Sequence, residues 1–233
     1  MTNEHEIKIT AGQVEDIKKW FFSYIQNLKL GNQPTTVHTI HKEKHSIRVA
    51  SEILYIGNSL ELSPDELNPD ELHLAEITAL LHDIGRFEQY ARFKTFVDGK
   101  SVNHALLGIE VLTENKVLNA FNEPIKNLIL RIIAYHNRAS LPDDETETCL
   151  FFAKLLRDAD KLDIYRVVTG YYRQKSSQRN AALELDLPDT PEFSDKIIEN
   201  LKSHQIVNIK HVKNLNDFKL LQAGWISDIN FAT

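Results

Sequence analysis

The sequence has few of the residues that build disulfide-bonded or thiolate-ligated proteins. Its single cysteine is Cys149, so neither a disulfide framework nor a thiolate metal cage can form within the chain. No run of about 18 apolar residues occurs, and the N-terminus lacks the apolar core of a signal peptide. We therefore expect a cytoplasmic protein with no membrane partner.

The chain also has fewer basic than acidic residues. The chain has 27 Lys and Arg against 33 Asp and Glu, a formal charge of −6 at pH 7. This balance argues against nucleic acid as a partner held by a broad basic surface, but it leaves room for a cationic pocket that binds a small phosphate ester. The 233 residues, 42% of them hydrophobic, are enough to bury a sizeable core.

Strand-like alternation of apolar and polar residues is absent, whereas helical spacing recurs along the chain. We predict an all-α helical bundle that opens with an amphipathic helix near Val14–Leu28. The predicted domains are residues 1–185, the helical core, and residues 186–233, a linker with a small helical C-terminal extension packed on that core. Within the extension we expect two short helices, near 195–204 and 215–230.

Local signals mark the middle of the chain. Ser63-Pro64-Asp65-Glu66 and Asn68-Pro69-Asp70-Glu71 each place a capping residue before proline and a glutamate at the third helical position. The second should start a helix that ends at His82-Asp83-Ile84, with Gly85 as its C-terminal stop. Residues 86–100 are rich in aromatics and read as an irregular segment. That segment is either a lid or base-stacking wall, or a loop pinned to the core.

Candidate ligands for a metal ion recur at inward-facing positions near predicted helix ends: His45, His82, Asp83, His104, His136 and Asp160. Imidazole and carboxylate groups bind divalent ions, and a carboxylate can bridge two of them. Taken singly, each has an ordinary explanation, such as a polar helix end or a hydrogen-bonded core histidine. The case for a metal site therefore rests on the set.

The order of these motifs resembles the HD-domain superfamily, a helical fold of metal-dependent phosphohydrolases with an HDIG-type doublet. The matching stretches are His45-Ser46-Ile47-Arg48-Val49-Ala50, Leu81-His82-Asp83-Ile84-Gly85 and Asp158-Ala159-Asp160-Lys161-Leu162-Asp163. The likeness covers roughly residues 36 to 172.

The resemblance implies a binuclear site with two divalent ions, drawn from Mn, Fe, Zn, Co and Ni. It implies two ligand sets that share Asp83: His45, His82 and Asp160 for one ion, and His104 and His136 for the other. Relatives that act on cyclic dinucleotides often carry a second histidine where this chain has Asn137, so we do not expect that specificity.

Four further roles are expected around these ligands. Arg86 stands where binuclear relatives often have a lysine, and we expect it to bind substrate phosphate and to act in catalysis together with Asp83. Lys94 is a second expected substrate contact. Asp163, one turn after Asp160, should orient either a ligand or Lys161 without itself binding metal.

The predicted function is hydrolysis of a phosphate ester or anhydride of a nucleotide, or of another small phosphorylated molecule, by a metal-activated hydroxide. Glu88 could serve as a general acid or base, although a solvated glutamate is the more common case. Two alternatives stay open: a di-iron HD-type oxygenase acting on a small alcohol, and a non-catalytic HD module that binds a ligand or partner. A homodimer is compatible with the sequence.

Overall fold

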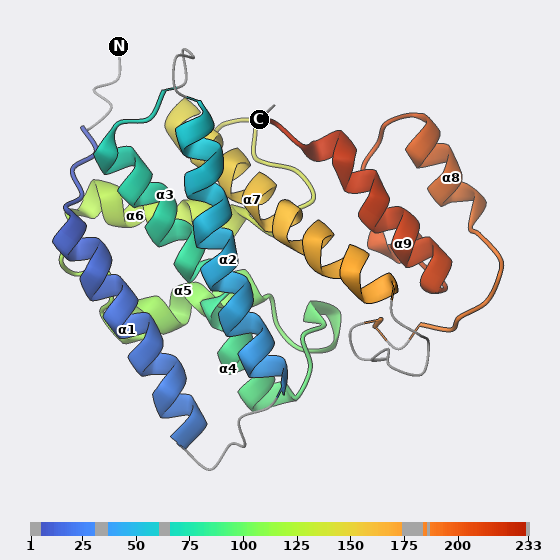
Figure 1. Cartoon of the computed structure of the whole chain (residues 1–233), viewed down its shortest axis with the longest axis horizontal. Helices are drawn as coiled ribbons and strands as arrows, with labels where there is room; N and C mark the ends of the chain where they lie inside the picture. Colours follow the sequence, from blue (N-terminus) through green and yellow to red (C-terminus); the bar gives the residue numbers. More distant parts are fainter. Residues whose placement is uncertain (1–5, 31–36, 61–65, 174–183, 186, 232–233) are drawn as a thin grey trace. The chain divides into compact units, whose positions relative to one another are not determined.

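The computed structural model of the chain describes residues 6–30, 37–60, 66–173, 184–185 and 187–231 (Figure 1). These residues form helices and connections, with no β-strand in the described ranges, so the predicted all-α class is confirmed. The chain divides into two compact units, Met1–Asp160 (unit 1) and Lys161–Ala232 (unit 2). The predicted domain boundary after residue 185, and the packing of the extension on the core, stay predictions.

The described residues of unit 1 form six α-helices and the first part of a seventh. They are α1 (Ala11–Leu30), α2 (Val37–Ser59), α3 (Pro69–Leu81), α4 (Ile84–Phe93), α5 (His104–Glu114), α6 (Glu123–Tyr135) and α7 (Glu147–Tyr172), which continues into unit 2. α3 packs against α1, α2 and α6, and α4 packs against α5 (Figure 1). The largest fully buried side chains come from all of these helices and include Phe21, Ile53, Ile77, Leu112 and Phe152. The core of unit 1 therefore lies around α3.

The start of α3 follows from its sequence. The Asn68 side chain accepts hydrogen bonds from the backbone N–H groups of Asp70 (2.9 Å) and Glu71 (3.1 Å). The Glu71 carboxylate in return accepts from the N–H of Asn68 at 2.8 Å. This capping box confirms the predicted helix start. The other signature falls largely on residues 63–65, outside the described residues.

The prediction of an irregular segment from residue 86 was wrong for its first half. α3 ends at Leu81, the chain turns through His82 and Asp83, and α4 runs from Ile84 to Phe93. Ile84 and Phe87 are 0% and 2% exposed, so α4 has a buried face of its own. The segment that follows α4 contains only one short 3₁₀ turn, η1 (Asp98–Lys100).

Gly85 is therefore not the stop of a helix but the second residue of one. It does not have a positive φ angle, so backbone freedom is not the reason for glycine. A Cβ atom at this position would lie 2.1 Å from the carbonyl oxygen of His104 and 2.5 Å from the backbone nitrogen of Gly108. Gly85 thus lets α4 approach the first turns of α5.

Unit 2 contains the end of α7, then α8 (Asp195–Lys202), η3 (Ile209–His211), α9 (Leu215–Gly224) and η4 (Trp225–Asp228). Its core is formed by Ile197, Val207 and Leu221, with Leu201 and Phe218 packed against them. The two short helices predicted for the C-terminal part are confirmed. No helix in the described parts of either unit has the length and apolar character needed to cross a membrane.

Candidate metal centre

Six side chains meet where the helices of unit 1 converge. His45 lies in α2, His82 and Asp83 in the turn between α3 and α4, His104 at the start of α5, His136 at the end of α6, and Asp160 in α7. The first five are less than a tenth exposed, and the Asp160 side chain is 20% exposed. The structure thus brings together all six residues singled out in the sequence. That they bind metal stays a prediction.

Local structure explains two of these positions. Asp83 ends the turn between α3 and α4, and its carbonyl accepts a hydrogen bond from the N–H of Arg86 at 2.9 Å, which starts the new helix. Asn103 caps α5 by accepting from the N–H groups of the second and third helical residues. His104 is therefore the first residue of a well-anchored helix, with its side chain directed at the turn.

The two oxygens of Asp83 face different pairs of histidines. Oδ2 lies 3.5 Å from Nε2 of His45 and 3.7 Å from Nε2 of His82. Oδ1 lies 3.3 Å from Nε2 of His104 and 3.8 Å from Nε2 of His136. The donor atoms within each of these two groups lie within 4.8 Å of one another. One carboxylate thus joins two potential metal sites.

Asp160 completes the first group. Its Oδ1 lies 3.1 Å from Nε2 of His45 and 3.9 Å from Nε2 of His82. The spacing of these donor atoms suits a shared divalent ion, because ligands held at about 2.1 Å from one ion lie roughly 3 Å or slightly more from each other.

The histidine rings are oriented to present Nε2 to the centre. Three of them place Nδ1 2.7 Å from an acceptor: His82 on the carbonyl of Ala79, His136 on the carbonyl of Ile133, and His104 on Oδ2 of Asp98. Because those acceptors carry no proton to donate, we assign the ring proton to Nδ1 and the lone pair to Nε2.

The Nε2 atoms of these rings converge on Asp83. Nε2 of His104 lies 3.0 Å from Nε2 of His136. Nε2 of His82 is buried and has no hydrogen-bond partner among the residues that the structure describes. Two lone pairs at that distance repel each other, and a buried nitrogen without a partner is costly. The donor set therefore fits divalent ions, which would satisfy every one of these atoms.

The protonation states suit such a site. Burial lowers the pKa of His82 to about 4, and burial also lowers the pKa of His104 to about 4, so both rings are neutral at pH 7. Burial alone would raise the pKa of Asp83, but the Lys42 ammonium, followed by His82, holds it well below the ordinary range. The pKa of Asp160 is also lowered, against the effect of burial, by its hydrogen bond with His45. Neutral imidazole and ionised carboxylate are the ligand forms that bind metal.

Two residues that sequence reasoning missed contact the predicted ligands. Lys42 Nζ lies 2.7 Å from Oδ2 of Asp83. Asp98 accepts from His104 Nδ1, from Arg86 Nη1 (2.9 Å) and from Gln89 Nε2 (2.9 Å). The only sequence signal at Asp98 is that it precedes a glycine, which marks a turn. Nothing in the sequence separates Lys42 from an ordinary surface lysine.

The remaining predicted residues lie in different surroundings. Arg86 is close to the centre, with Nε 3.5 Å from Oδ1 of Asp83. Lys94 is exposed at the end of α4, where its ammonium donates to the carbonyl of Ala91 at 2.9 Å. Asp163 is fully buried in the part of α7 that belongs to unit 2. The substrate contacts of Arg86 and Lys94, and the orienting role of Asp163, stay predictions.

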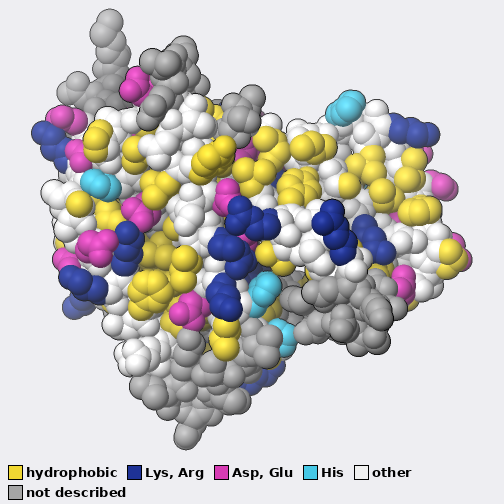
Figure 2. Space-filling view, in the orientation of Figure 1, with side chains coloured by type: hydrophobic (Ala, Val, Ile, Leu, Met, Phe, Trp, Pro, Cys, Tyr) yellow, Lys and Arg dark blue, Asp and Glu magenta, His cyan; other side chains and the backbone are white. Residues whose placement is uncertain are grey.

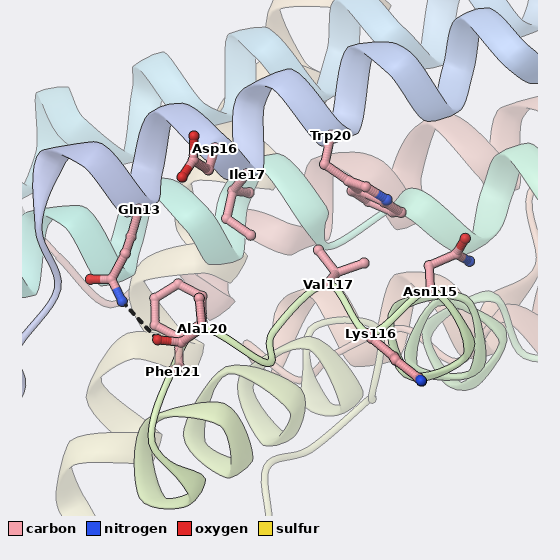
Figure 3. Close-up of a pocket in the computed structure, with 9 residues that line it drawn as sticks. All are labelled: Gln13, Asp16, Ile17, Trp20, Asn115, Lys116, Val117, Ala120 and Phe121. Atoms are coloured by element: carbon pink, nitrogen blue, oxygen red, sulfur yellow. Dashed lines mark hydrogen bonds between the residues drawn. The ribbon is translucent and has the colours of Figure 1, made fainter.

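A separate pocket lies between α1 and the connection from α5 to α6 (Figure 3). Trp20, Val117 and Phe121 are among its lining residues, and Gln13 donates a hydrogen bond to the carbonyl of Ala120 across it at 3.0 Å. None of the six candidate ligands lines this pocket. It is therefore distinct from the metal centre.

A sequence model described as "HD domain" matches residues 43–165, which include all six candidate ligands and more than half of the chain. The chain belongs to the HD-domain family. HD domains bind divalent metals and are generally metal-dependent phosphohydrolases, so membership explains why histidines and aspartates from four helices and a turn gather at one point.

The HD-domain chain also resembles one much longer protein. It is 40% identical over 80 residues to the CRISPR system single-strand-specific deoxyribonuclease Cas10/Csm1 (subtype III-A) of Methanocaldococcus jannaschii. The match covers 33% of this chain and 10% of that relative, so the chain spans about a tenth of its length. No solved structure matches the chain.

Proposed function

We propose that this HD-domain protein is a binuclear metal-dependent phosphohydrolase that acts on a small phosphorylated molecule, in the first place a nucleotide. The observation that carries the proposal is the Asp83 carboxylate, with a pair of histidine Nε2 atoms on each of its oxygens. Such an arrangement is unusual in an ordinary helical core, where most buried polar atoms have a hydrogen-bond partner.

The charges around the centre favour an anionic substrate. Asp83 and Asp160 contribute negative charge, whereas Lys42 and Arg86 contribute positive charge at opposite oxygens of Asp83. Two divalent ions added to this set would leave several positive charges in excess, even with the nearby carboxylate of Asp98. A phosphate dianion would offset most of that excess, and an uncharged substrate would not.

Bound divalent ions would supply a Lewis acid for the phosphoryl oxygens and lower the pKa of water. The chain's own residues then have distinct tasks. The neutral histidines hold their Nε2 lone pairs in place through their Nδ1 hydrogen bonds. Arg86, fixed by Asp98, directs its guanidinium towards the side of Asp83 that faces His104. From there it can bind a phosphate oxygen and stabilise charge that develops during hydrolysis.

The relative from Methanocaldococcus jannaschii supports cleavage of a bond to phosphorus. That relative is named as a deoxyribonuclease specific for single strands. Single-stranded DNA therefore belongs in the substrate panel, beside nucleoside monophosphates and sugar phosphates. The overall charge of −6 favours the small substrates.

The experiment is metal analysis of protein purified without chelator, followed by hydrolysis of the panel by wild type and by Asp83→Asn. We expect about two ions per wild-type chain, with most of the metal and the hydrolysis lost in Asp83→Asn while far-UV circular dichroism stays helical. Asp217→Asn, the same change at a buried carboxylate of unit 2, is the matched control and should keep its metal.

Three results would count against the proposal. If wild type contains no metal and cannot be reconstituted with it, the six residues do not form a metal centre. If Asp83→Asn hydrolyses the panel as well as wild type does, the proposed mechanism is wrong. Iron as the main metal, with oxygen uptake on a small alcohol and no phosphate release, would favour the oxygenase alternative instead.

A further inference from the structure

A group of aromatic side chains lies beside the metal centre, and neither the ligand set nor the core of unit 1 accounts for it. Tyr90 of α4 packs against Phe96 with ring centroids 5.0 Å apart and planes tilted by 31°. His38, in the first turn of α2, lies 5.3 Å from the Tyr90 ring and 6.1 Å from the Phe96 ring, centroid to centroid. We call Tyr90, Phe96 and His38 the aromatic wall.

Lys42 connects this wall to the centre. Its ammonium is 2.7 Å from Oδ2 of Asp83 and lies over the Phe96 ring, 5.9 Å from the centroid. On the other side, Arg86 Nη1 donates a hydrogen bond to the backbone carbonyl of Phe96. Phe96 is thus in contact with both cations that flank Asp83. A substrate with its phosphate between these cations would have its next group against the wall.

Helix α2 carries two further cations, on a different face from Lys42. Lys44 is exposed and Arg48 half-buried on the same helix as Lys42. Figure 2 shows Lys and Arg side chains gathered beside histidines on one face of unit 1.

The wall differs from the aromatic residues that hold α4 in place. Phe87 is 2% exposed and packs edge-on against Phe21 of α1, which is typical of a core contact. Tyr90, Phe96 and His38 are only half-buried, so parts of their rings stay accessible. Accessible aromatic rings next to a cation are the combination with which proteins hold bases, because each base offers a π face at a fixed distance from its phosphate.

We propose that Tyr90, Phe96 and Lys42 form a base subsite, in which the base of a free nucleotide lies against the aromatic wall while its phosphate reaches Lys42 and the metal centre. This inference rests on the proposed phosphohydrolase function and makes its substrate specific. The enzyme would prefer nucleoside monophosphates to sugar phosphates that lack the base.

The test compares two substrates that differ by the base alone, adenosine 5′-monophosphate and ribose 5-phosphate. For wild type we expect a higher kcat/KM with the nucleotide. Phe96→Leu keeps the apolar packing but removes the ring, and it should lower the ratio of the two kcat/KM values about fivefold to tenfold, mainly through KM for the nucleotide. Phe93→Leu, at the exposed phenylalanine that ends α4, is the matched control and should leave the ratio unchanged.

Binding gives a readout that does not depend on turnover. In saturation-transfer NMR with the protein and adenosine 5′-monophosphate, the base protons should receive more saturation than the ribose protons. This difference should shrink in Phe96→Leu and persist in Phe93→Leu.

The outcomes separate the two proposals. If wild type hydrolyses both compounds equally well and Phe96→Leu leaves the ratio unchanged, the base subsite is wrong and the phosphohydrolase stands. If wild type with its metal hydrolyses no member of the phosphate panel, the proposed function itself fails. Preference for a single-stranded oligodeoxynucleotide over the free nucleotide would overturn the assignment to a free nucleotide.

Discussion

Replacing Gly85 with alanine tests how the metal centre is assembled. The added Cβ would lie 2.1 Å from the carbonyl oxygen of His104 and 2.5 Å from the nitrogen of Gly108, both backbone atoms of α5. Neither atom can rotate away, so α4 and α5 must separate. Overpacking costs about 1–3 kcal/mol, and we expect the upper end here. Alanine is better than glycine in a helix by roughly 1 kcal/mol, which leaves a net loss of about 2 kcal/mol.

Thermal unfolding followed by far-UV circular dichroism measures this loss. A change of about 2 kcal/mol should lower the Tm by about 4–8 °C in a chain of this size. The Gly85→Ala protein should also retain less metal while still folded, because His104 moves with the backbone that is displaced. Gly170→Ala is the control, since nothing lies within 4 Å of a Cβ there, and it should be neutral or stabilising by up to about 1 kcal/mol. A Gly85→Ala protein that melts with wild type and keeps its metal would refute the close-approach argument.

Three further predictions concern single side chains. Asp98→Asn should weaken metal affinity about 10–100-fold in competition with a chelator, because it loses the charge that orients His104; unchanged affinity would contradict this. Burial raises the pKa of Asp217, but hydrogen bonds from Ser194 more than reverse this, so its pKa lies below the ordinary value. The ionised Asp217 carboxylate therefore stabilises the folded protein at pH values above the ordinary aspartate pKa. This stabilisation is lost as the pH falls through the lowered pKa of Asp217 in the folded state. Asp217→Asn should be less stable at pH 7 by about 1–3 kcal/mol. Its free energy of unfolding in urea should also fall less steeply than that of wild type as the pH is lowered; an unchanged pH dependence would contradict this. Burial raises the pKa of the Cys149 thiol to about 12, so it should react with a thiol reagent at pH 8 only after denaturation; rapid reaction in the native protein would argue against its burial.

Local signals in the sequence predicted several elements well. The start of α3 depends on Asn68 and Glu71, which lie within one turn of each other, so the pattern is visible without the fold. Gly85 shows the limit of such reasoning. A glycine after a helical run usually marks a helix end, but here its requirement comes from α5, whose contacting residues follow about twenty positions later.

In the candidate site, too, some residues could be predicted from the sequence and others could not. The six proposed ligands stand out because histidine and aspartate are unusual in apolar stripes, and the structure brings all of them together. Lys42 and Asp98 do not stand out, because the role of each depends on a contact with a residue that is distant in sequence. Lys42 contacts a carboxylate 41 positions away, and Asp98 contacts an amide of Asn137 39 positions away. A lysine on a helix and an aspartate before a glycine are ordinary until those partners are known.

Asp98 also couples the opening of the connection between α4 and α5 to the binding of an ion at His104. His104, Arg86, Gln89 and Asn137 all reach this one carboxylate, so the connection between α4 and α5 cannot open without releasing them together. Its opening is then a single cooperative event that also frees the His104 ring. By mass action, an ion bound to that ring would hold the connection closed, with a stabilisation that grows with the logarithm of the free ion concentration. Amide hydrogen exchange in this stretch would thus report the occupancy of a site to which the stretch itself supplies no ligand.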